Sequence, residues 1–197
     1  VHKTVGDMEG ISRLKEKTIN IGVFDGMGKA KLQGELGLST KQEAEELFNQ
    51  YHERVPFVRD LMNETSRWAS REGEIRTLLG RGCRFNKWEP AQFGMHTPMT
   101  WEDAMKKYGE NRIRRAFTYK ALNKLIQGSA ADMTKKAMLD LYKEGIVAHI
   151  QIHDELDISV ESDKQAKRII EIMESAVDLE IPNKVDYESG KNWGDIH

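Results

Sequence analysis

The stretch Ile150-Gln-Ile-His-Asp-Glu-Leu-Asp-Ile-Ser-Val160 decides the fold of the C-terminal part of the chain. β-favouring residues precede His153-Asp154-Glu155, and apolar residues then recur at every second position from Leu156 to Val160. Alternation with a period of two is typical of a strand with one buried face. The stretch therefore predicts a β-hairpin with an acidic pair, Asp154 and Glu155, at or near its turn.

Two adjacent carboxylates on a tight hairpin repel one another and are partly desolvated by the sheet. A divalent cation relieves this repulsion, and hard oxygen ligands suit magnesium or manganese. A solvated acidic turn explains the same residues without a metal. The hairpin alone leaves both interpretations open.

Composition indicates a globular protein with a reduced cysteine. The 197 residues suffice for one sizeable core or two small ones, and 31% charged with 39% hydrophobic residues is ordinary for a soluble domain. No apolar run is long enough to cross a bilayer, and no signal-peptide pattern opens the chain. The single cysteine, Cys83, excludes an internal disulfide or a Cys-rich zinc site and favours a cytoplasmic location.

Charge is unevenly distributed along the chain. The formal net charge of −2 does not indicate nucleic-acid binding, but basic residues concentrate in 3–31, 67–87 and 106–124, and acidic residues dominate 154–188. An enzyme that handles a polyanion with metal ions needs a basic face beside an acidic centre. Neutral proteins also show such clusters by chance.

A helix is predicted from Gly10 to Met27. Arg13, Lys17 and Asn20 share one face of it, and glycines become frequent near its end. This row of basic residues can bind an anionic ligand, and the glycines allow a flat group to approach the backbone closely. A solvated helix face explains the spacing equally well.

Two further helices are predicted to be structural. Thr40 can cap the first, with Glu43 three residues later, and Pro56 starts the second. We expect their apolar side chains to be buried, namely Ala44, Leu47, Phe48 and Tyr51 in the first and Phe57, Leu61 and Trp68 in the second.

A second hairpin is predicted from two extended runs, 74–79 and 83–88, around Gly80-Arg81-Gly82. Arg81 at its tip can contact phosphate, although an exposed turn arginine needs no ligand. Residues 90–98 read as a loop.

From Trp101 to Glu144 the pattern is helical, with an interruption near Gly109. Asn123 and Gln127 lie four apart on one face, and their carboxamides can hydrogen-bond acceptors on nucleic-acid bases or satisfy polar groups in a core. After the first hairpin, a helix is predicted from Asp163 to Leu179, capped by Ser162, and Asn183 to Tyr187 is predicted as a last strand beside the hairpin.

Several separated stretches together resemble the family A DNA polymerases, which include bacterial DNA polymerase I and many phage enzymes. Arg13–Gly26 resembles motif B of the fingers, Asn123–Asp132 the long palm helix, and Gln151–Leu156 motif C. Thr77–Arg81 and Asn192–His197 are similar to two more landmarks of the family in their usual order.

The resemblance implies an α+β fold. Residues 1–72 are expected to form fingers helices that include motif B, and residues 73–197 the remainder of the fingers and the palm. In the palm, a small antiparallel sheet with the motif C hairpin (146–161) is expected to pack on long helices, one of them spanning 110–144, before a C-terminal helix and strand.

The resemblance also implies an activity. A family A member is a DNA-directed DNA polymerase, a nucleotidyltransferase that transfers dNMP from dNTP to a primer 3′-hydroxyl with two magnesium ions. The implied partners are primer-template DNA and dNTPs, and no membrane is involved. The implied location is the cytoplasm of a bacterium or of a phage-infected cell.

Motif B implies the nucleotide contacts. Arg13 and Lys17 are expected to bind the triphosphate, and Lys17 to act catalytically by neutralising charge that builds toward pyrophosphate. Ile21 and Asp25 lie beside the nucleotide, where the family usually has an aromatic residue and often a tyrosine. Tyr119 stands where an arginine often precedes the palm asparagine by four. Because of these three departures from the family pattern, sugar discrimination, fidelity and the minor-groove contact are expected to differ.

Motif C and the palm helix imply the remaining roles. Asp154 is expected to ligate magnesium, with Glu155 as an auxiliary catalytic and metal-binding carboxylate. The residues expected to contact DNA are Arg81, Asn123, Gln127 and His153.

Motif A, which supplies the other metal-bridging aspartate, has no match in the chain; Val1-His2-Lys3 resembles the residues just after it. We therefore expect this chain to polymerise poorly alone and to need an N-terminal polymerase fragment or subunit. A non-catalytic DNA-binding module is the alternative, against which Arg13, Lys17, Asp154 and Glu155 argue together. A metal-dependent hydrolase would need further ligands.

Overall fold

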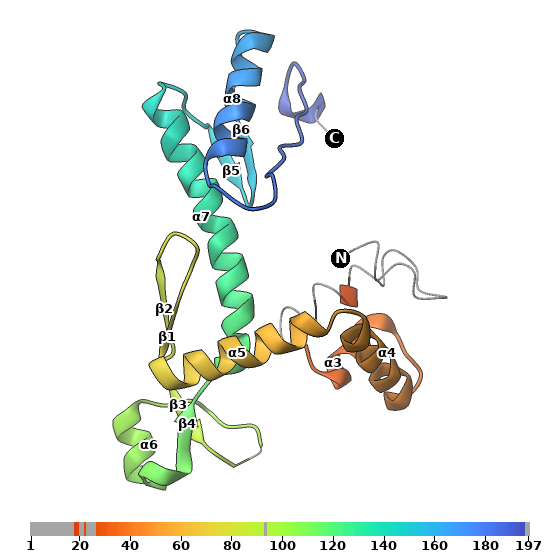
Figure 1. Ribbon diagram of the computed structural model, residues 1–197, viewed down its shortest axis with the longest axis vertical. Coiled ribbons are helices and arrows are strands. Elements are labelled where there is room, and N and C mark those ends of the chain that lie inside the picture. Colours follow the sequence, from red (N-terminus) through yellow and green to blue (C-terminus); the bar gives the residue numbers. More distant parts are fainter. Residues whose placement is uncertain (1–17, 20–21, 23–26, 93, 196–197) are drawn as a thin grey trace. The chain divides into compact units, whose positions relative to one another are not determined.

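The computed structural model describes residues 18–19, 22, 27–92 and 94–195, and the chain divides into two compact units, 1–126 and 127–197 (Figure 1). Within these residues, helices combine with three two-stranded antiparallel sheets. This confirms the expected α+β class. None of the helices within the described residues is long and apolar enough to span a membrane.

From residue 27 onward, the first unit contains three successive helices, α3 (Lys29–Leu36), α4 (Lys41–Arg54) and α5 (Pro56–Glu72). Thr40 caps α4 as predicted, since its side-chain oxygen accepts a hydrogen bond from the Glu43 backbone N–H at 3.1 Å. The apolar side of α4 is also confirmed. A core cluster joins these helices: Ile19, Leu32, Leu36, Tyr51, Val55 and Val58.

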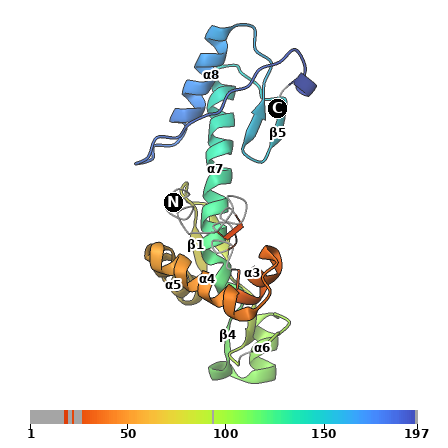
Figure 2. The ribbon, with the colours of Figure 1, turned by 90° about the vertical axis from the view of Figure 1, so that its right-hand side faces the viewer.

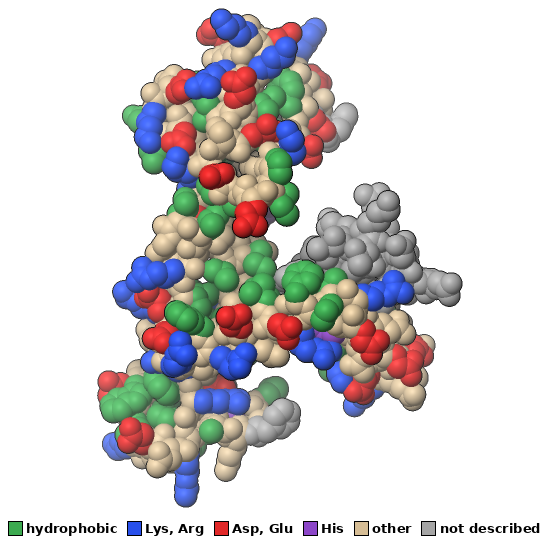
Figure 3. Space-filling model, viewed as in Figure 1, with side chains coloured by type: hydrophobic (Ala, Val, Ile, Leu, Met, Phe, Trp, Pro, Cys, Tyr) green, Lys and Arg blue, Asp and Glu red, His purple; other side chains and the backbone are tan. Residues whose placement is uncertain are grey.

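The expected buried side of α5 is wrong. Phe57, Leu61 and Trp68 are 53%, 37% and 52% exposed, and apolar side chains lie open along this helix (Figure 3). Val58 and Ala69 are the buried residues instead. Met62 also packs against the first core cluster, so the packed side of α5 lies next to the expected one.

The predicted second hairpin is confirmed as β1 (Glu74–Arg76) paired with β2 (Gly82–Arg84). Trp88 does not extend it, because Trp88 opens β3 (Trp88–Pro90), which pairs with β4 (Ile113–Arg115). Between α5 and β1, Gly73 has φ +74°, and its carbonyl accepts from the Phe85 backbone N–H at 2.8 Å. This junction packs on a second small core: Ala69, Ile75, Phe85 and Ala121.

The long helix begins later than expected. After α6 (Trp101–Tyr108), the chain forms two short 3₁₀ turns, η1 (Glu110–Arg112) and η2 (Thr118–Lys120), with β4 between them. Helix α7 then runs from Ala121 to Lys143 and continues from the first unit into the second. The predicted helix over 110–144 is therefore wrong in its first eleven residues, because β4 is held by backbone pairing with a strand far away in sequence.

The second unit packs β5 (Ile150–Ile152), β6 (Glu155–Asp157) and α8 (Asp163–Ser175) on α7, and α8 and β5 lie on either side of α7 in Figure 2. Its core is small: Leu141, Ile169 and Ile172 are buried, and Ile146, Leu156, Ile158 and Met173 pack against them. Ser162 caps α8 as predicted.

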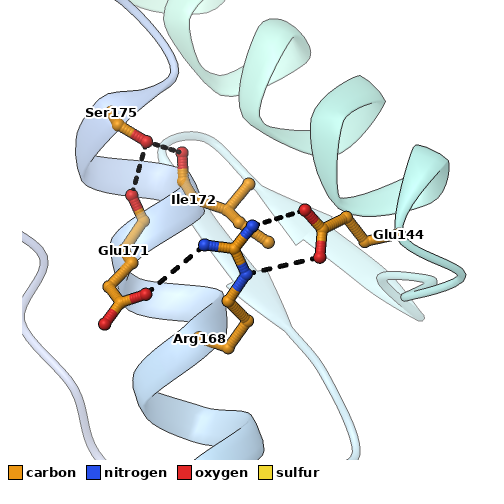
Figure 4. A network of polar contacts seen from close by, with 5 residues as sticks. All are labelled: Glu144, Arg168, Glu171, Ile172 and Ser175. Carbon is orange, nitrogen blue, oxygen red and sulfur yellow. Dashed lines mark hydrogen bonds and ion pairs between the residues drawn. The ribbon is translucent and has the colours of Figure 1, made fainter.

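An ion-pair network at the surface connects the residue after α7 to α8 (Figure 4). The Arg168 guanidinium donates to both carboxylate oxygens of Glu144 and, at 3.4 Å, to Glu171. Hydrogen bonding to Arg168 holds the pKa of Glu144 below its ordinary value. The planar guanidinium thus fixes the helix pair through two parallel hydrogen bonds.

The end of the second unit differs from the prediction in two places. Helix α8 stops at Ser175, four residues before the predicted Leu179. Asn183 to Tyr187 forms no strand. The Val185 backbone N–H donates instead to the Glu174 carboxylate at 3.1 Å, so a side chain replaces the expected strand partner.

Candidate functional site

The hairpin at Ile150–Asp157 has the tight turn that its sequence predicts. Ile152 pairs with Glu155, so only His153 and Asp154 form the turn. His153 has φ +54° and Asp154 does not have a positive φ, which is the sign pattern of a type II′ hairpin turn. The backbone thus fixes Asp154 at the tip and Glu155 at the first position of β6.

Polar contacts hold this turn on both strands. The Gln151 side-chain amide donates to the His153 carbonyl at 3.0 Å. At the open end, the His149 backbone N–H donates to the Asp157 carbonyl at 2.9 Å, and the His149 ring lies 3.1 Å from the Ser159 hydroxyl. The register is therefore fixed from both ends, and the tip carboxylates are displayed on a defined backbone.

Three carboxylates, not two, lie on this hairpin. Asp154 and Glu155 are exposed, and Asp157 is half-buried on the same face of β6 as Glu155. One Asp157 oxygen, Oδ2, is buried without a hydrogen-bond partner among the described residues. Sequence reasoning missed Asp157, although its spacing of two from Glu155 already placed both carboxylates on one face.

The donor chemistry of this tip fits magnesium, which favours carboxylate oxygens and usually keeps several waters. The number of donors does not complete a site, because the described part of the chain contains no group of three or more His, Cys, Asp and Glu residues placed to hold a metal. Asp154 and Glu155 are therefore suited to supply part of a metal site.

Helix α7 carries the two predicted carboxamides. Asn123 is half-buried and Gln127 is exposed, four residues further along the same helix. Asn123 belongs to the first unit, and Gln127 belongs to the second with His153, Asp154 and Glu155. The start of α7 is tied to the β1–β2 hairpin by Lys124, whose ammonium lies 3.5 Å from the Cys83 sulfur and 5.3 Å from the centre of the Phe85 ring.

Arg81 lies exposed in the turn of the β1–β2 hairpin, as predicted. Its backbone N–H donates to the Thr77 hydroxyl and its carbonyl accepts from the Thr77 N–H, both at 3.0 Å. Gly80 has φ +85°, a conformation that glycine adopts without strain. The turn is thus well ordered around Arg81.

The predicted nucleotide contacts Arg13, Lys17, Ile21 and Asp25 lie outside the described residues. Of the helix predicted from Gly10 to Met27, Thr18, Ile19 and Gly22 are described and helical, whereas Met27 is not helical.

Comparison with known proteins assigns the chain to a family. The sequence pattern of DNA polymerase family A matches residues 1–195. The chain belongs to DNA polymerase family A. This confirms the resemblance inferred from the separated motifs.

Individual family A relatives agree. The chain is 32% identical to a DNA-directed DNA polymerase of Pseudomonas phage M6, an alignment that covers 98% of this chain and 31% of the phage protein. It is 31% identical to DNA polymerase I of Geobacillus stearothermophilus, with 98% of this chain and 21% of that protein covered. This family A chain therefore spans about a fifth to a third of the length of these relatives.

A solved family A structure has the same fold. The POL domain of Pol1 from M. smegmatis, determined in complex with DNA primer-template and dNTP, is 26% identical, with a TM-score of 0.65. The match covers 86% of this chain and 28% of that one.

Proposed function

We propose that the chain is the C-terminal part of a DNA-directed DNA polymerase that transfers dNMP from dNTP to a primer 3′-hydroxyl under the direction of a template. The observation that carries the proposal is the hairpin tip, where a two-residue turn presents Asp154 and Glu155 in a member of DNA polymerase family A. The M. smegmatis neighbour was determined with primer-template and dNTP, and this supports the same two substrates here.

In this proposal the acidic tip holds magnesium. Asp154 is the main ligand and Glu155 an auxiliary one; both are exposed, Asp154 in the turn and Glu155 at the first position of β6. Two magnesium ions, when bound, stabilise the attacking and leaving oxygens of an in-line displacement. His153 precedes Asp154 in the turn and positions the primer end.

The DNA contacts come from side chains that can bind DNA of any base sequence. Asn123 and Gln127 hydrogen-bond the template-primer near the primer terminus, since carboxamides both donate and accept. Arg81, at the tip of its own hairpin, contacts phosphate.

The nucleotide contacts come from the segment before α3. Arg13 and Lys17 bind the triphosphate, with Ile21 and Asp25 beside the nucleotide, and Lys17 neutralises charge as pyrophosphate leaves. Residues 1–72 then belong to the fingers, and residues 73–197 to the remaining fingers and the palm.

The incomplete donor set at the tip supports a further part of the proposal. A second metal-bridging aspartate comes from a preceding polymerase fragment or subunit. In support of this, the described residues contain no group of three or more His, Cys, Asp and Glu residues placed to hold a metal. Primer extension is therefore expected from the chain together with such a fragment, and little or none from the chain alone. Robust extension by the purified 197-residue chain would contradict this requirement.

The decisive experiment is primer extension and primer-template binding by the assembled enzyme with Asp154→Ala. We expect extension to be abolished and DNA affinity to stay close to that of the wild type, because the carboxylate acts through the metal. Asp178→Ala, which removes an exposed carboxylate elsewhere in the same unit, is the matched control. Equal losses of affinity and rate in Asp154→Ala would refute the metal-ligand role.

A second variant tests the basic helix separately. Lys17→Ala is expected to weaken dNTP use, measured as the dNTP concentration needed for half-maximal extension. DNA affinity should change little. If only the DNA affinity falls, the residue contacts DNA and not the triphosphate. If neither variant affects extension, a non-catalytic DNA-binding module becomes the better description.

A further inference from the structure

Two exposed aromatic rings and one lysine gather just before helix α7. The Lys120 ammonium lies 5.3 Å from the centre of the Phe117 ring and 5.7 Å from that of the Tyr119 ring. Phe117 is 39% exposed and Tyr119 is 55% exposed. These three residues form an aromatic–lysine cluster, and all of them lie in the first unit.

The backbone beneath this cluster is firmly held. Phe117 has φ +63°, a left-handed conformation that bulky residues rarely adopt, and the Lys120 N–H donates to its carbonyl at 2.9 Å. The short turn η2 packs against α5, and the next two residues, Ala121 and Leu122, are buried at 0% and 2% exposure. The rings are therefore presented to solvent from a rigid support.

The charge around the cluster favours an anionic partner. Residues 101–124 contain seven Lys and Arg against three Asp and Glu. Among the ion pairs of the described residues, none involves Lys120, whose cation faces the two rings instead. A lysine held over ring faces keeps its charge available while its position is restricted.

We propose that the aromatic–lysine cluster binds unpaired DNA bases at the junction of primer and template, with Tyr119 stacking on a base and Lys120 contacting a phosphate. Exposed aromatic faces beside cations are the features that bind single-stranded nucleic acid without regard to sequence, because every base has a π-face. Tyr119 lies four residues before Asn123, which the proposed function places near the primer terminus. The inference rests on that function.

The test measures binding of the full chain to a fluorescent oligo-dT strand and to a blunt-ended duplex by anisotropy. Tyr119→Ala should weaken binding to the single strand by about tenfold, as expected for the loss of one stacked base, and should affect the duplex less. Tyr119→Phe keeps the ring and should bind like the wild type. Tyr142→Ala, which removes a 68% exposed tyrosine on α7, is the matched control and should bind unchanged.

Lysine variants test the phosphate contact independently. Lys120→Ala should reduce the slope of log K against log salt for the single strand by about 0.7, the value for one phosphate contact. Lys107→Ala is the control, because its ammonium also lies over a ring, 5.2 Å from the centre of Tyr108. Thermal unfolding of every variant must match that of the wild type, so that a change in affinity reflects the surface.

Three results would overturn the inference: wild-type affinity of Tyr119→Ala for the single strand, an equal loss in Tyr142→Ala, or an absence of single-strand binding by the wild type. Asn123→Ala, measured on primer-template, separates this failure from failure of the proposed function. If Asn123→Ala weakens primer-template binding and Tyr119→Ala leaves single-strand binding unchanged, the cluster is not a stacking site and the polymerase proposal stands.

Discussion

Gly73 is the position at which a single methyl group should most disturb the first unit. It has φ +74°, and a Cβ added there would lie 2.6 Å from Cζ of Arg115. That guanidinium is not free to move away without loss, because it donates to the Phe85 carbonyl at 2.9 Å and lies 4.6 Å from the centre of the Trp88 ring. Gly73→Ala therefore strains the backbone and displaces an anchored side chain.

The expected magnitude follows from these contacts. A left-handed conformation in a non-glycine residue costs about 1 kcal/mol. Displacement of Arg115 weakens a charge-assisted hydrogen bond and a cation–π contact, which adds about 2 kcal/mol. We expect Gly73→Ala to lower the free energy of unfolding of the first unit by about 3 kcal/mol, a large fraction of the stability of a small domain.

Urea unfolding followed by tryptophan fluorescence measures this loss. Trp88 is one of the fluorophores, and its ring lies beside the Arg115 guanidinium. Gly37→Ala is a closely matched control, because Gly37 also ends a helix with positive φ, +62°, but has no atom within 4 Å of its added Cβ. It should lose about 1 kcal/mol. If Gly73→Ala loses no more than Gly37→Ala, the steric argument is wrong.

Three smaller effects are expected. Thr40→Ala should lower the unfolding free energy by about 1 kcal/mol through loss of the α4 cap, whereas Thr40→Ser should retain most of it; urea midpoints distinguish them. Burial, and secondarily the charge of Arg59, holds the pKa of His52 below its ordinary 6.5. The contribution of His52 to stability should therefore be constant above pH 6.5 and fall as the pH drops below 6.5, where the unfolded chain binds the proton first. His52→Gln should remove this component from unfolding curves measured between pH 7.5 and 5. Arg168→Lys should slightly lower the thermal midpoint by losing the bidentate contact with Glu144, and the difference should shrink in 1 M salt.

The hairpin and the caps could be predicted because their signals are local. Alternation around His153-Asp154-Glu155 gave both the turn and the display of the two carboxylates, and Thr40 and Ser162 cap the helices that follow them. In each case the residues that determine the structure are neighbours in sequence.

The errors concern partners that are distant in sequence. Residues 113–115 form β4 only because β3 lies beside them, and no local pattern reveals that pairing. The covered face of α5 was misjudged for the same reason: large apolar residues at 57, 61 and 68 mark an apolar surface, but only the rest of the fold determines which side is packed. Asp157 escaped notice because its burial depends on tertiary packing.

The left-handed backbone at His153 restricts which residues can precede Asp154. β-branched residues are strained at φ +54°, whereas glycine, asparagine and histidine tolerate it. The backbone conformation of the turn therefore limits which residues position 153 can accept, whatever chemistry is required of that residue. It also makes His153→Gly an unusually clean substitution, since the imidazole is removed while the path of the chain to Asp154 is preserved.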